Sequence, residues 1–308
     1  MLQGKNLISI DDLTRDDIDS VLELARYFET DGYLRHRLDG VIMGSLFFES
    51  STRTRLSFDS AMQRVGGRVI GFSDSSATSY GKKGESFSDT IKMIDGYSDV
   101  IVIRHPDHGA ASKAAAVAEH PVINAGDGAN EHPTQTLIDL HAIQSSQGKI
   151  DGLTIALVGD LKYGRVPHSL AKALSLYPAT RQIWIAPDSL RMPEDIRQRI
   201  ISAGVDVKET SDLSVALAEA DVIYMTRVQA ERFEDQAEYD QVKDIYVLQP
   251  ELLTTVKPNL RILHALPRRY EIPESIDKTK YAYYFEQAKG GVPVRASLLT
   301  HILGQVKP

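Results

Sequence analysis

The sequence contains no cysteine among its 308 residues. Disulfide frameworks, thiolate metal sites and a cysteine nucleophile are therefore excluded, and the composition fits a reducing compartment. No apolar run approaches the roughly 20 residues that a membrane-spanning helix needs. The first residues also lack the apolar region of a signal peptide. We therefore expect a cytoplasmic protein without a membrane partner.

Runs of basic residues are missing as well. The formal net charge is -7, and Lys and Arg are spread along the chain. Such a chain is a poor partner for nucleic acid. Two nucleotide-binding patterns are also absent. No strand–helix junction carries G-x-G-x-x-G, and the loop at residues 159–165 ends in Arg165 followed by Val166, where a Walker A loop needs Lys and Ser or Thr.

What the sequence does contain is a repeated alternation of short apolar runs and amphipathic stretches. The apolar runs predict strands at 41–48, 69–72, 99–103, 121–124, 153–158, 182–186, 205–208, 221–225 and 261–264. The amphipathic stretches predict helices at 52–65, 87–97, 110–118, 134–147, 164–176, 193–203, 212–219 and from 294 onward. Residues 73–86, rich in Ser, Gly and Lys, predict a mobile loop.

This alternation is typical of parallel sheets covered by helices on both faces. The length fits about two domains. We predict an α/β protein of two similar three-layer αβα domains with parallel sheets, joined by helices. The predicted boundaries place residues 1–133 and 286–308 in one domain and 148–285 in the other, with 134–147 as the connecting helix.

Ligands of open parallel sheets bind beyond the carboxyl ends of the strands, so the residues after each strand are the informative ones. After the first predicted strand comes Glu49 and then Ser51-Thr52-Arg53-Thr54-Arg55, which opens a helix. Free N–H groups at a helix start favour an anion, and hydroxyl and guanidinium donors match phosphate oxygens. An ordinary helix cap with solvent-facing arginines is the alternative. Phosphate binding is the better interpretation.

Two further strand ends carry polar side chains. Arg104 follows the strand at 99–103, and a glycine-containing loop leads from the strand at 121–124 to His132 at a helix start. A histidine in this position can donate a hydrogen bond to a carbonyl oxygen and stabilise charge that develops there. A structural histidine with satisfied hydrogen bonds is the alternative.

The second half repeats this placement. Arg165 follows the strand at 153–158, and Arg227 and Gln229 follow the strand at 221–225. Alternate residues of an extended segment face one side, so Arg227 and Gln229 should point the same way. Two guanidinium groups from separate strand ends suit a molecule with two carboxylates. Each arginine alone would fit a surface ion pair, but the repetition favours a pocket.

Two other segments carry candidate groups. The sequence from Ser79 to Glu85 places two lysines between glycines and predicts a flexible cationic arm, with an ordinary solvated loop as the alternative. After the strand at 261–264, Pro267 predicts a rigid turn that offers a backbone carbonyl to the crevice.

Taken together, these motifs resemble the catalytic chains of the aspartate carbamoyltransferase family over nearly the full length. The matching motifs are FFE-x-STRTR (47–55), GKKGE (81–85), RHP (104–106), NAGDG (124–128), HPTQ (132–135), GDLKYGR (159–165), MTRVQ (225–229) and LPR (266–268). The resemblance implies a carbamoyltransferase fold. It also implies that carbamoyl phosphate and L-aspartate react to N-carbamoyl-L-aspartate and phosphate, a step toward pyrimidines.

The resemblance implies a role for each matched residue. It assigns the phosphate to Ser51, Thr52, Arg53 and Thr54, and the carbonyl oxygen to Thr54, Arg104 and His132. It assigns the carbamoyl nitrogen to Gln135, and the aspartate carboxylates to Arg165, Arg227 and Gln229. The backbone carbonyl of Leu266, before a cis-Pro267, would receive the attacking amine. The first predicted domain would then bind carbamoyl phosphate, and the second aspartate.

The resemblance also implies a homotrimer with active sites at subunit interfaces, in which Ser79 and Lys83 of one subunit reach the substrates bound by its neighbour. Glu49 would hold the domains closed through Arg165 and Arg232. Regulatory chains in a larger assembly are compatible with the resemblance. No cofactor and no metal are implied, because the amine of aspartate is itself the nucleophile and catalysis can come from positioning and charge stabilisation.

The chain departs from the family pattern at a few positions: Ser50 for proline, Val166-Pro167 for Thr-Val, Ala265 for proline, and Arg269-Tyr270 for Val-Asp. None removes a predicted substrate contact. The closest rival is an ornithine carbamoyltransferase, which shares the STRTR motif but presents a cysteine after its late histidine. Arg227 should reject ornithine, because two desolvated cations would face each other. A non-catalytic phosphate-binding module is the rival from another class, and it would not need carboxylate-directed arginines.

Overall fold

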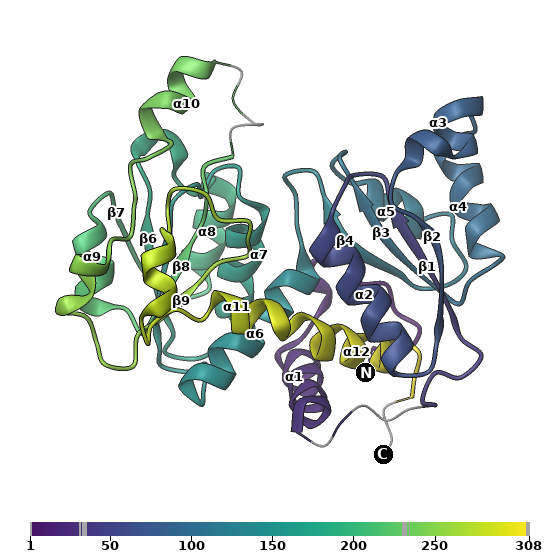
Figure 1. Cartoon of the computed structure of the whole chain (residues 1–308), viewed down its shortest axis with the longest axis horizontal. Helices are drawn as coiled ribbons and strands as arrows, with labels where there is room; N and C mark the ends of the chain where they lie inside the picture. Colours follow the sequence, from purple (N-terminus) through teal and green to yellow (C-terminus); the bar gives the residue numbers. More distant parts are fainter. Residues whose placement is uncertain (1, 31, 33–35, 230–232, 234, 306–308) are drawn as a thin grey trace. The chain divides into compact units, whose positions relative to one another are not determined.

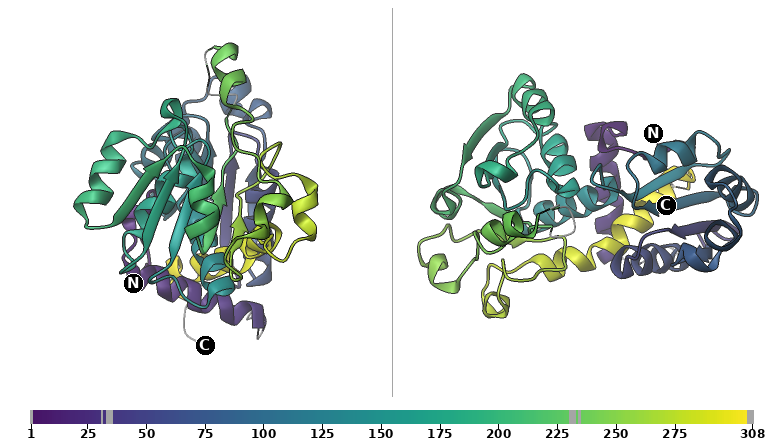
Figure 2. Two further views of the ribbon diagram at one scale, coloured as in Figure 1. Left: turned by 90° about the vertical axis from the view of Figure 1, so that its left-hand side faces the viewer. Right: turned by 90° about the horizontal axis from the view of Figure 1, so that it is seen from above.

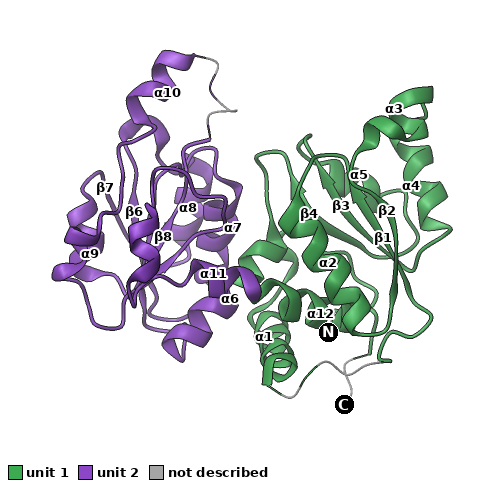
Figure 3. Cartoon of the chain, in the orientation of Figure 1, with its two compact units in different colours: residues 1–138, 290–308 green, residues 139–289 purple. Residues whose placement is uncertain are grey.

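The computed structural model describes residues 2–30, 32, 36–229, 233 and 235–305. They form two compact units, which Figure 3 shows in different colours. Unit 1 comprises residues 1–138 and 290–308, and unit 2 comprises residues 139–289. The chain leaves unit 1 within helix α6 (Pro133–Gln147), the helix that we predicted to connect the domains. It returns to unit 1 between residues 289 and 290.

Unit 1 is built around a parallel sheet in the order β2-β1-β3-β4 (Figure 1). The strands are β1 (Ile42–Phe47), β2 (Arg68–Phe72), β3 (Val100–His105) and β4 (Val122–Asp127). The helices are α1 (Arg15–Thr30), α2 (Thr52–Arg64), α3 (Ser79–Lys83), α4 (Phe87–Asp95), α5 (Ala110–Ala115), α12 (Gly291–Ile302) and the start of α6. Strands β3 and β4 are buried throughout, as expected for parallel strands covered on both faces.

Helices cover both faces of this sheet. On one face, Ile91 of α4 and Ala111 of α5 pack against apolar residues of β1, β3 and β4. On the other face, α2 packs against β1 and β2, and α12 and α1 follow as an outer layer (Figure 2). Helix α2 buries Phe58 and Met62 on its inner side. The apolar spacing of these helices therefore produces the predicted three layers.

Unit 2 repeats the architecture with a parallel sheet in the order β7-β6-β5-β8-β9. The strands are β5 (Thr154–Val158), β6 (Arg181–Ile185), β7 (Asp206–Thr210), β8 (Val222–Met225) and β9 (Arg261–Leu263). The helices are α7 (Arg165–Leu174), α8 (Glu194–Ser202), α9 (Leu213–Glu219), α10 (Gln236–Val242), α11 (Tyr284–Lys289) and the end of α6. Among the helices of the described residues, none combines the length and the apolar character needed to span a bilayer.

The prediction of a mobile loop over residues 73–86 is wrong in part. The segment contains a 3₁₀ turn at Ser75–Ala77 and the short helix α3. The Asp74 carboxylate accepts from the backbone N–H of Ser76 at 2.8 Å, and Thr78 caps α3. Gly84 ends α3 in the left-handed conformation with φ +71°. Side-chain caps at both turns outweigh the low helix propensity of the glycines.

Two strands extend further than their apolar runs suggest. Strand β3 includes Arg104 and His105, which we expected just beyond its end, and β4 continues to Asp127. The reason is backbone pairing: the Phe48 N–H donates to the Arg104 carbonyl at 2.9 Å, and the Gly128 N–H donates to the His105 carbonyl at 3.0 Å. Hydrogen bonding thus carries the strands into their polar ends.

The sequence analysis assigned no element to residues 15–30, which form α1. Its signals are nevertheless present. The Thr14 hydroxyl accepts from the Asp17 N–H at 3.2 Å, and the Asp17 carboxylate accepts from the Thr14 N–H at 3.3 Å. This reciprocal capping precedes an apolar face that includes Ile18 and Leu22.

The pairing of β2 with β1 requires glycine at position 71. Gly71 has φ +143°, and a Cβ there would lie 2.0 Å from the Ser45 carbonyl oxygen. We expect Gly71→Ala to lower the free energy of unfolding by about 2–4 kcal/mol, because the backbone clash adds to the unfavourable φ. Gly40→Ala is the matched control, since Gly40 also has positive φ but open space around it, and should cost about 1–2 kcal/mol. Urea unfolding followed by circular dichroism measures both, and equal losses would contradict the clash.

Candidate active site

Each sheet has one point at which the strand order reverses direction. In unit 1 the chain moves outward from β1 to β2 and then to the other side with β3, so the reversal lies between β1 and β3. In unit 2 it lies between β5 and β8. Loops diverge at such points and leave a crevice at the carboxyl ends of the strands, where ligands of open α/β sheets bind. In unit 1, Ser51 to Thr54 follow β1 and Arg104 lies near the end of β3; in unit 2, Arg165 follows β5, and Arg227 and Gln229 follow β8.

The junction between β1 and α2 is an open helix start. Ser51 occupies the N-cap with extended backbone, but its side chain makes no capping hydrogen bond. The donors of the first turn therefore remain available to a ligand. The Thr54 side chain is buried at the same end, whereas Arg53 is exposed. Within the described ranges, the Arg53 guanidinium has no hydrogen-bond or ion-pair partner.

Arg104 lies on the neighbouring strand with its side chain largely buried. Its guanidinium pairs with the Glu49 carboxylate at 3.2 Å and donates to the Ala125 carbonyl at 3.4 Å. The Nε atom is buried without an acceptor. Burial lowers the pKa of Arg104, Glu49 opposes this shift, and nearby Arg53 adds to it. A positive charge held in this way would be stabilised further by an anionic ligand.

His132 lies at the start of α6, directly after β4 and its loop. The side chain is buried, and its Nδ1 is 3.4 Å from the Thr134 hydroxyl. The preceding residue, Glu131, fixes this point by accepting from the Ser9 hydroxyl at 2.9 Å and from the Ile10 N–H at 2.8 Å. Gln135 follows in the first turn of the helix. The ends of β1, β3 and β4 thus gather the predicted phosphate and carbonyl ligands at one edge of one sheet.

Ser79 and Lys83 belong to α3, on a different segment of unit 1. The Lys83 side chain is exposed. No hydrogen bond or ion pair among the described residues joins Ser79 or Lys83 to the residues that follow β1, β3 and β4. Among the described residues of a single chain, Ser79 and Lys83 therefore make no polar contact with the other predicted phosphate ligands.

In unit 2, Asp160 holds the two predicted aspartate-binding loops together. Its buried carboxylate accepts from the Tyr163 N–H at 2.9 Å and from the Gln229 N–H at 3.3 Å. The Gln229 side chain donates to the Tyr163 carbonyl at 2.9 Å. Burial raises the pKa of Asp160, while these backbone donors and Arg227 oppose the shift. Arg165 begins α7 at the end of the same loop, so Arg165, Arg227 and Gln229 belong to adjoining strand ends.

The segment after β9 is held in an unusual backbone conformation. Leu266 has φ +57°, and the Leu266–Pro267 peptide bond is cis. The His264 Nδ1 accepts from the Leu266 N–H at 2.7 Å, so Nε2 carries the proton and donates to the Glu271 carboxylate at 2.8 Å. The Arg269 N–H also donates to Glu271, at 3.1 Å. These bonds fix the Leu266 backbone.

Three acidic residues that hold these loops were not predicted from the sequence: Glu131, Asp160 and Glu271. Each is buried. Asp160 and Glu271 accept backbone N–H groups of loops that follow strands, and Glu131, itself in the loop after β4, accepts from the Ile10 N–H of the N-terminal segment. A signal existed for Asp160, which stands between a strand and Gly164, where a loop needs acceptors. Arg232, one predicted partner of Glu49, lies outside the described residues; in the structure Glu49 pairs with Arg104.

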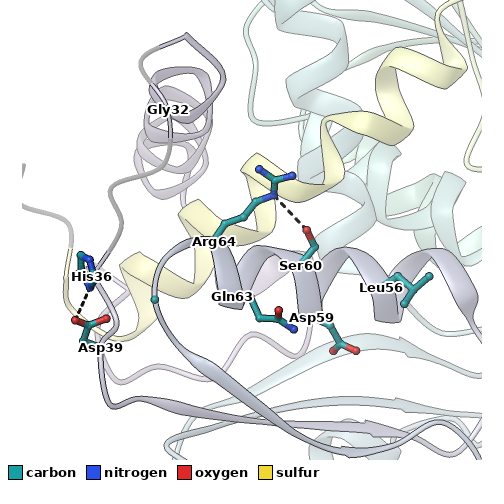
Figure 4. A pocket seen from close by; sticks show the side chains of 9 residues that line it. Gly32, His36, Asp39, Leu56, Asp59, Ser60, Gln63 and Arg64 are labelled. Carbon is teal, nitrogen blue, oxygen red and sulfur yellow. Dashed lines mark hydrogen bonds and ion pairs between the residues drawn. The ribbon is translucent and has the colours of Figure 1, made fainter.

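A surface hollow of about 1040 Å³ lies beside the exposed face of α2 in unit 1 (Figure 4). It is lined by Gly32, His36, Asp39, Leu56, Asp59, Ser60, Gln63, Arg64 and Gly66. Among its polar contacts, His36 pairs with Asp39 at 2.8 Å, Arg64 donates to the Ser60 hydroxyl at 3.3 Å, and Asp59 accepts from the Ser45 hydroxyl at 2.9 Å. None of the predicted site residues lines this hollow, which is therefore separate from the candidate active site.

Both halves of the chain match domains of one known protein family. Residues 5–145 match the carbamoyl-P binding domain of aspartate/ornithine carbamoyltransferases, and residues 151–302 match the Asp/Orn binding domain. The chain belongs to the aspartate/ornithine carbamoyltransferase family.

Individual members of the family are similar over almost the whole chain. The aspartate carbamoyltransferase catalytic subunit of Thermococcus kodakarensis is 54% identical, and that of Methanothrix thermoacetophila is 49% identical, with at least 98% of each chain covered. The aspartate transcarbamoylase of Trypanosoma cruzi, solved in complex with carbamoyl phosphate and aspartate, superimposes with a TM-score of 0.93 at 39% identity, covering 98% of both chains. The catalytic subunit from M. jannaschii gives 0.89 at 43% identity, covering 97% of this chain and 98% of that one. The predicted fold of two parallel-sheet α/β domains is confirmed.

The Glu271 carboxylate, with its hydrogen bonds from His264 and the Arg269 N–H, forms what we call the Glu271 clamp. The stability that this clamp contributes depends on pH. Burial raises the pKa of Glu271, but hydrogen bonds from His264 and the Arg269 backbone outweigh it and bring the pKa below its ordinary 4.5. The stabilisation is therefore complete above pH 4.5 and is lost as the pH falls through the lower folded pKa. We expect Glu271→Gln to lower the free energy of unfolding by about 1–3 kcal/mol at pH 7, with the gap closing toward pH 3. Unfolding measured across this range tests the clamp, and a gap independent of pH would refute it.

Proposed function

We propose that this protein is an aspartate carbamoyltransferase, which transfers the carbamoyl group of carbamoyl phosphate to the α-amino group of L-aspartate. One observation carries the proposal. Each sheet places cationic groups at its own reversal point, beside an open helix start in unit 1 and as two arginines on adjoining strand ends in unit 2. The first arrangement suits a phosphate, and the second suits a dicarboxylate.

In unit 1, we assign the phosphate to Ser51, Thr52, Arg53 and Thr54, with the helix start supplying backbone N–H donors. Arg104, His132 and Thr54 would donate to the carbonyl oxygen, and Gln135 would contact the carbamoyl nitrogen. The buried Nε of Arg104, which has no acceptor, supports its assignment as an electrophilic donor. Donors fixed before the reaction stabilise developing negative charge without reorganisation, which is the largest contribution in many enzymes.

In unit 2, we assign the aspartate carboxylates to Arg165, Arg227 and Gln229. The Leu266 carbonyl would accept a hydrogen bond from the amine, with Pro267 fixing its direction. The uncharged amine attacks the carbonyl carbon, the bond from carbon to the phosphate oxygen breaks, and the nitrogen releases one proton. The products are N-carbamoyl-L-aspartate and phosphate. No covalent enzyme intermediate, metal or cofactor enters this scheme.

The Glu49–Arg104 pair suggests how the charges rearrange. We propose that bound carbamoyl phosphate replaces Glu49 as the partner of Arg104, and that Glu49 then pairs with Arg165 and Arg232 to hold the domains closed. Support comes from the 3.2 Å separation between Glu49 and Arg104, which keeps the buried cation neutralised before an anion is bound. Unit 1 would then be the carbamoyl phosphate domain and unit 2 the aspartate domain.

We further propose a homotrimer in which Ser79 and Lys83 of each subunit complete the site of a neighbour, with Lys83 reaching both substrates. Among the described residues, no polar contact joins α3 to the other phosphate ligands of the same chain, as this arrangement requires. Among the large apolar side chains that unit 1 exposes, a subunit interface would cover Leu56, Ile70, Met93 and Tyr97. The proposed setting is pyrimidine synthesis in the cytoplasm, with room for regulatory chains to join the trimer.

The proposed function is tested by assaying the purified protein with carbamoyl phosphate and either L-aspartate or L-ornithine. We expect product from aspartate alone, because the ornithine side-chain amine would face Arg227.

Arg53→Ala should lower turnover by about two to three orders of magnitude, as for loss of a preorganised donor. Arg227→Ala should instead weaken the binding of aspartate by about 1.5–3 kcal/mol and leave the affinity for carbamoyl phosphate near normal. Carbamoylation of ornithine, or a loss of carbamoyl phosphate affinity in Arg227→Ala, would contradict the assignment.

Shared active sites predict complementation between inactive subunits. Arg53→Ala subunits keep α3 intact, and Lys83→Ala subunits keep the phosphate site intact. Mixing the two after reversible dissociation should restore activity, because some interfaces then combine two intact halves. Aspartate carbamoylation before and after mixing is the measurement, with each variant dissociated and reassembled alone as the control. Mixed oligomers that stay inactive would rule out a donated α3.

A further inference from the structure

Five aromatic rings of unit 1 form a cluster around Phe48, which we call the aromatic cluster. Phe48 contacts four other rings, with centroid separations of 5.0 Å to Phe72, 5.2 Å to Tyr80, 5.6 Å to Phe87 and 4.9 Å to His105. The rings of Phe72 and Tyr80 stand edge-on to Phe48, at interplanar angles of 87° and 85°. Edge-to-face pairs are a favoured and directional arrangement, so the cluster fixes orientation as well as contact.

One side of the aromatic cluster adjoins the candidate phosphate site. Phe48 directly precedes Glu49, and His105 directly follows Arg104. The Phe48 N–H donates to the Arg104 carbonyl at 2.9 Å, and the side chains of Glu49 and Arg104 form an ion pair. Phe48 and His105 therefore sit on backbone that the sheet and the ion pair hold in place.

The other side of the aromatic cluster carries α3. This helix has five residues, too few to be stable alone in water. Tyr80 is its second residue, and its ring contacts both Phe48 and Phe87, the latter at 6.5 Å. Lys83, the residue proposed to act in a neighbouring site, is one turn further along the same helix.

A close backbone approach also holds α3 in position. A Cβ at Gly81 would lie 2.4 Å from the Ser75 carbonyl oxygen, so the helix rests directly on the preceding 3₁₀ turn. The Tyr80 hydroxyl makes no hydrogen bond to any described residue. The ring, rather than the hydroxyl, is therefore the anchoring group.

We propose that Tyr80 is a positioning residue: through its ring contacts with Phe48 and Phe87 it holds α3 against the sheet of its own chain, so that Lys83 is presented to the active site of the neighbouring subunit. This inference rests on the proposed function, in which Lys83 acts across the interface. Its distinctive consequence is that loss of the Tyr80 ring impairs the neighbour's site more than the site of the chain that carries the change.

Mixed trimers of Arg53→Ala and Lys83→Ala subunits separate these two effects. In them, each restored site combines the phosphate ligands of a Lys83→Ala chain with α3 of an Arg53→Ala chain. Tyr80→Leu placed in the Arg53→Ala chain should lower restored activity roughly twofold to tenfold, the scale of one aromatic pair. The same change in the Lys83→Ala chain should have less than about a twofold effect, because α3 of that chain already lacks its amine.

Two variants separate the ring from other features of the helix. Tyr80→Phe in the Arg53→Ala chain should preserve restored activity, because it keeps the ring. Gly81→Ala in that chain should reduce it with all five rings retained, because the added methyl group displaces α3 from Ser75. Tyr27→Leu, at an exposed tyrosine of α1 outside the aromatic cluster, is the matched control and should change nothing.

The outcomes distinguish the inference from the proposed function. Equal losses from Tyr80→Leu in either chain, or no loss in either, would overturn the inference while the parental mixture still shows complementation. Failure of the parental mixture itself would overturn the shared site, and the inference would fall with it. A loss confined to the chain that donates α3, restored by Tyr80→Phe, would support the assignment of Tyr80.

Discussion

The cost of burying the Arg104 cation is the constraint on which the organisation of the candidate site in unit 1 depends. Arg104 is buried with Arg53 nearby, and both effects lower the pKa of its guanidinium. Glu49 offsets this cost from 3.2 Å away. A buried cation needs a partner charge while no anionic ligand is bound, and the Glu49 carboxylate supplies one beside Arg104.

Buried acids also explain how a chain with net charge -7 presents cationic sites. Asp160 and Glu271 accept backbone N–H groups of strand-end loops, and Glu131 joins the loop after β4 to the Ile10 N–H, so their charges are used within the scaffold. The loops that must hold donors at fixed positions are thereby tied down by charge-assisted hydrogen bonds, which are stronger than neutral ones. Charged scaffold residues and charged ligand-binding residues are thus separate sets.

The same strand ends have a second structural role in unit 1. The backbone that carries Glu49 and Arg104 continues into Phe48 and His105; the Phe48 ring contacts Tyr80 of α3, and the His105 ring packs on Phe48. A short helix with few hydrogen bonds of its own is thus oriented by aromatic contacts with a rigid sheet. The carboxyl ends of β1 and β3 therefore support both the candidate phosphate site and α3, the segment proposed to serve a neighbour.

The sequence alone determined the two α/β units, because apolar runs and amphipathic stretches are local patterns, and its motifs were enough to indicate the family. It failed over residues 73–86, where the caps at Asp74 and Thr78 overrode glycine-rich composition, and at β3, where pairing with β1 carried the strand through Arg104. Only the tertiary structure decided that Glu49 pairs with Arg104, that Asp160 joins two loops 69 residues apart, and that Tyr80 packs on Phe48. The physical reason is that these contacts join residues distant in the chain, and no local pattern encodes which distant groups the folded sheet brings together.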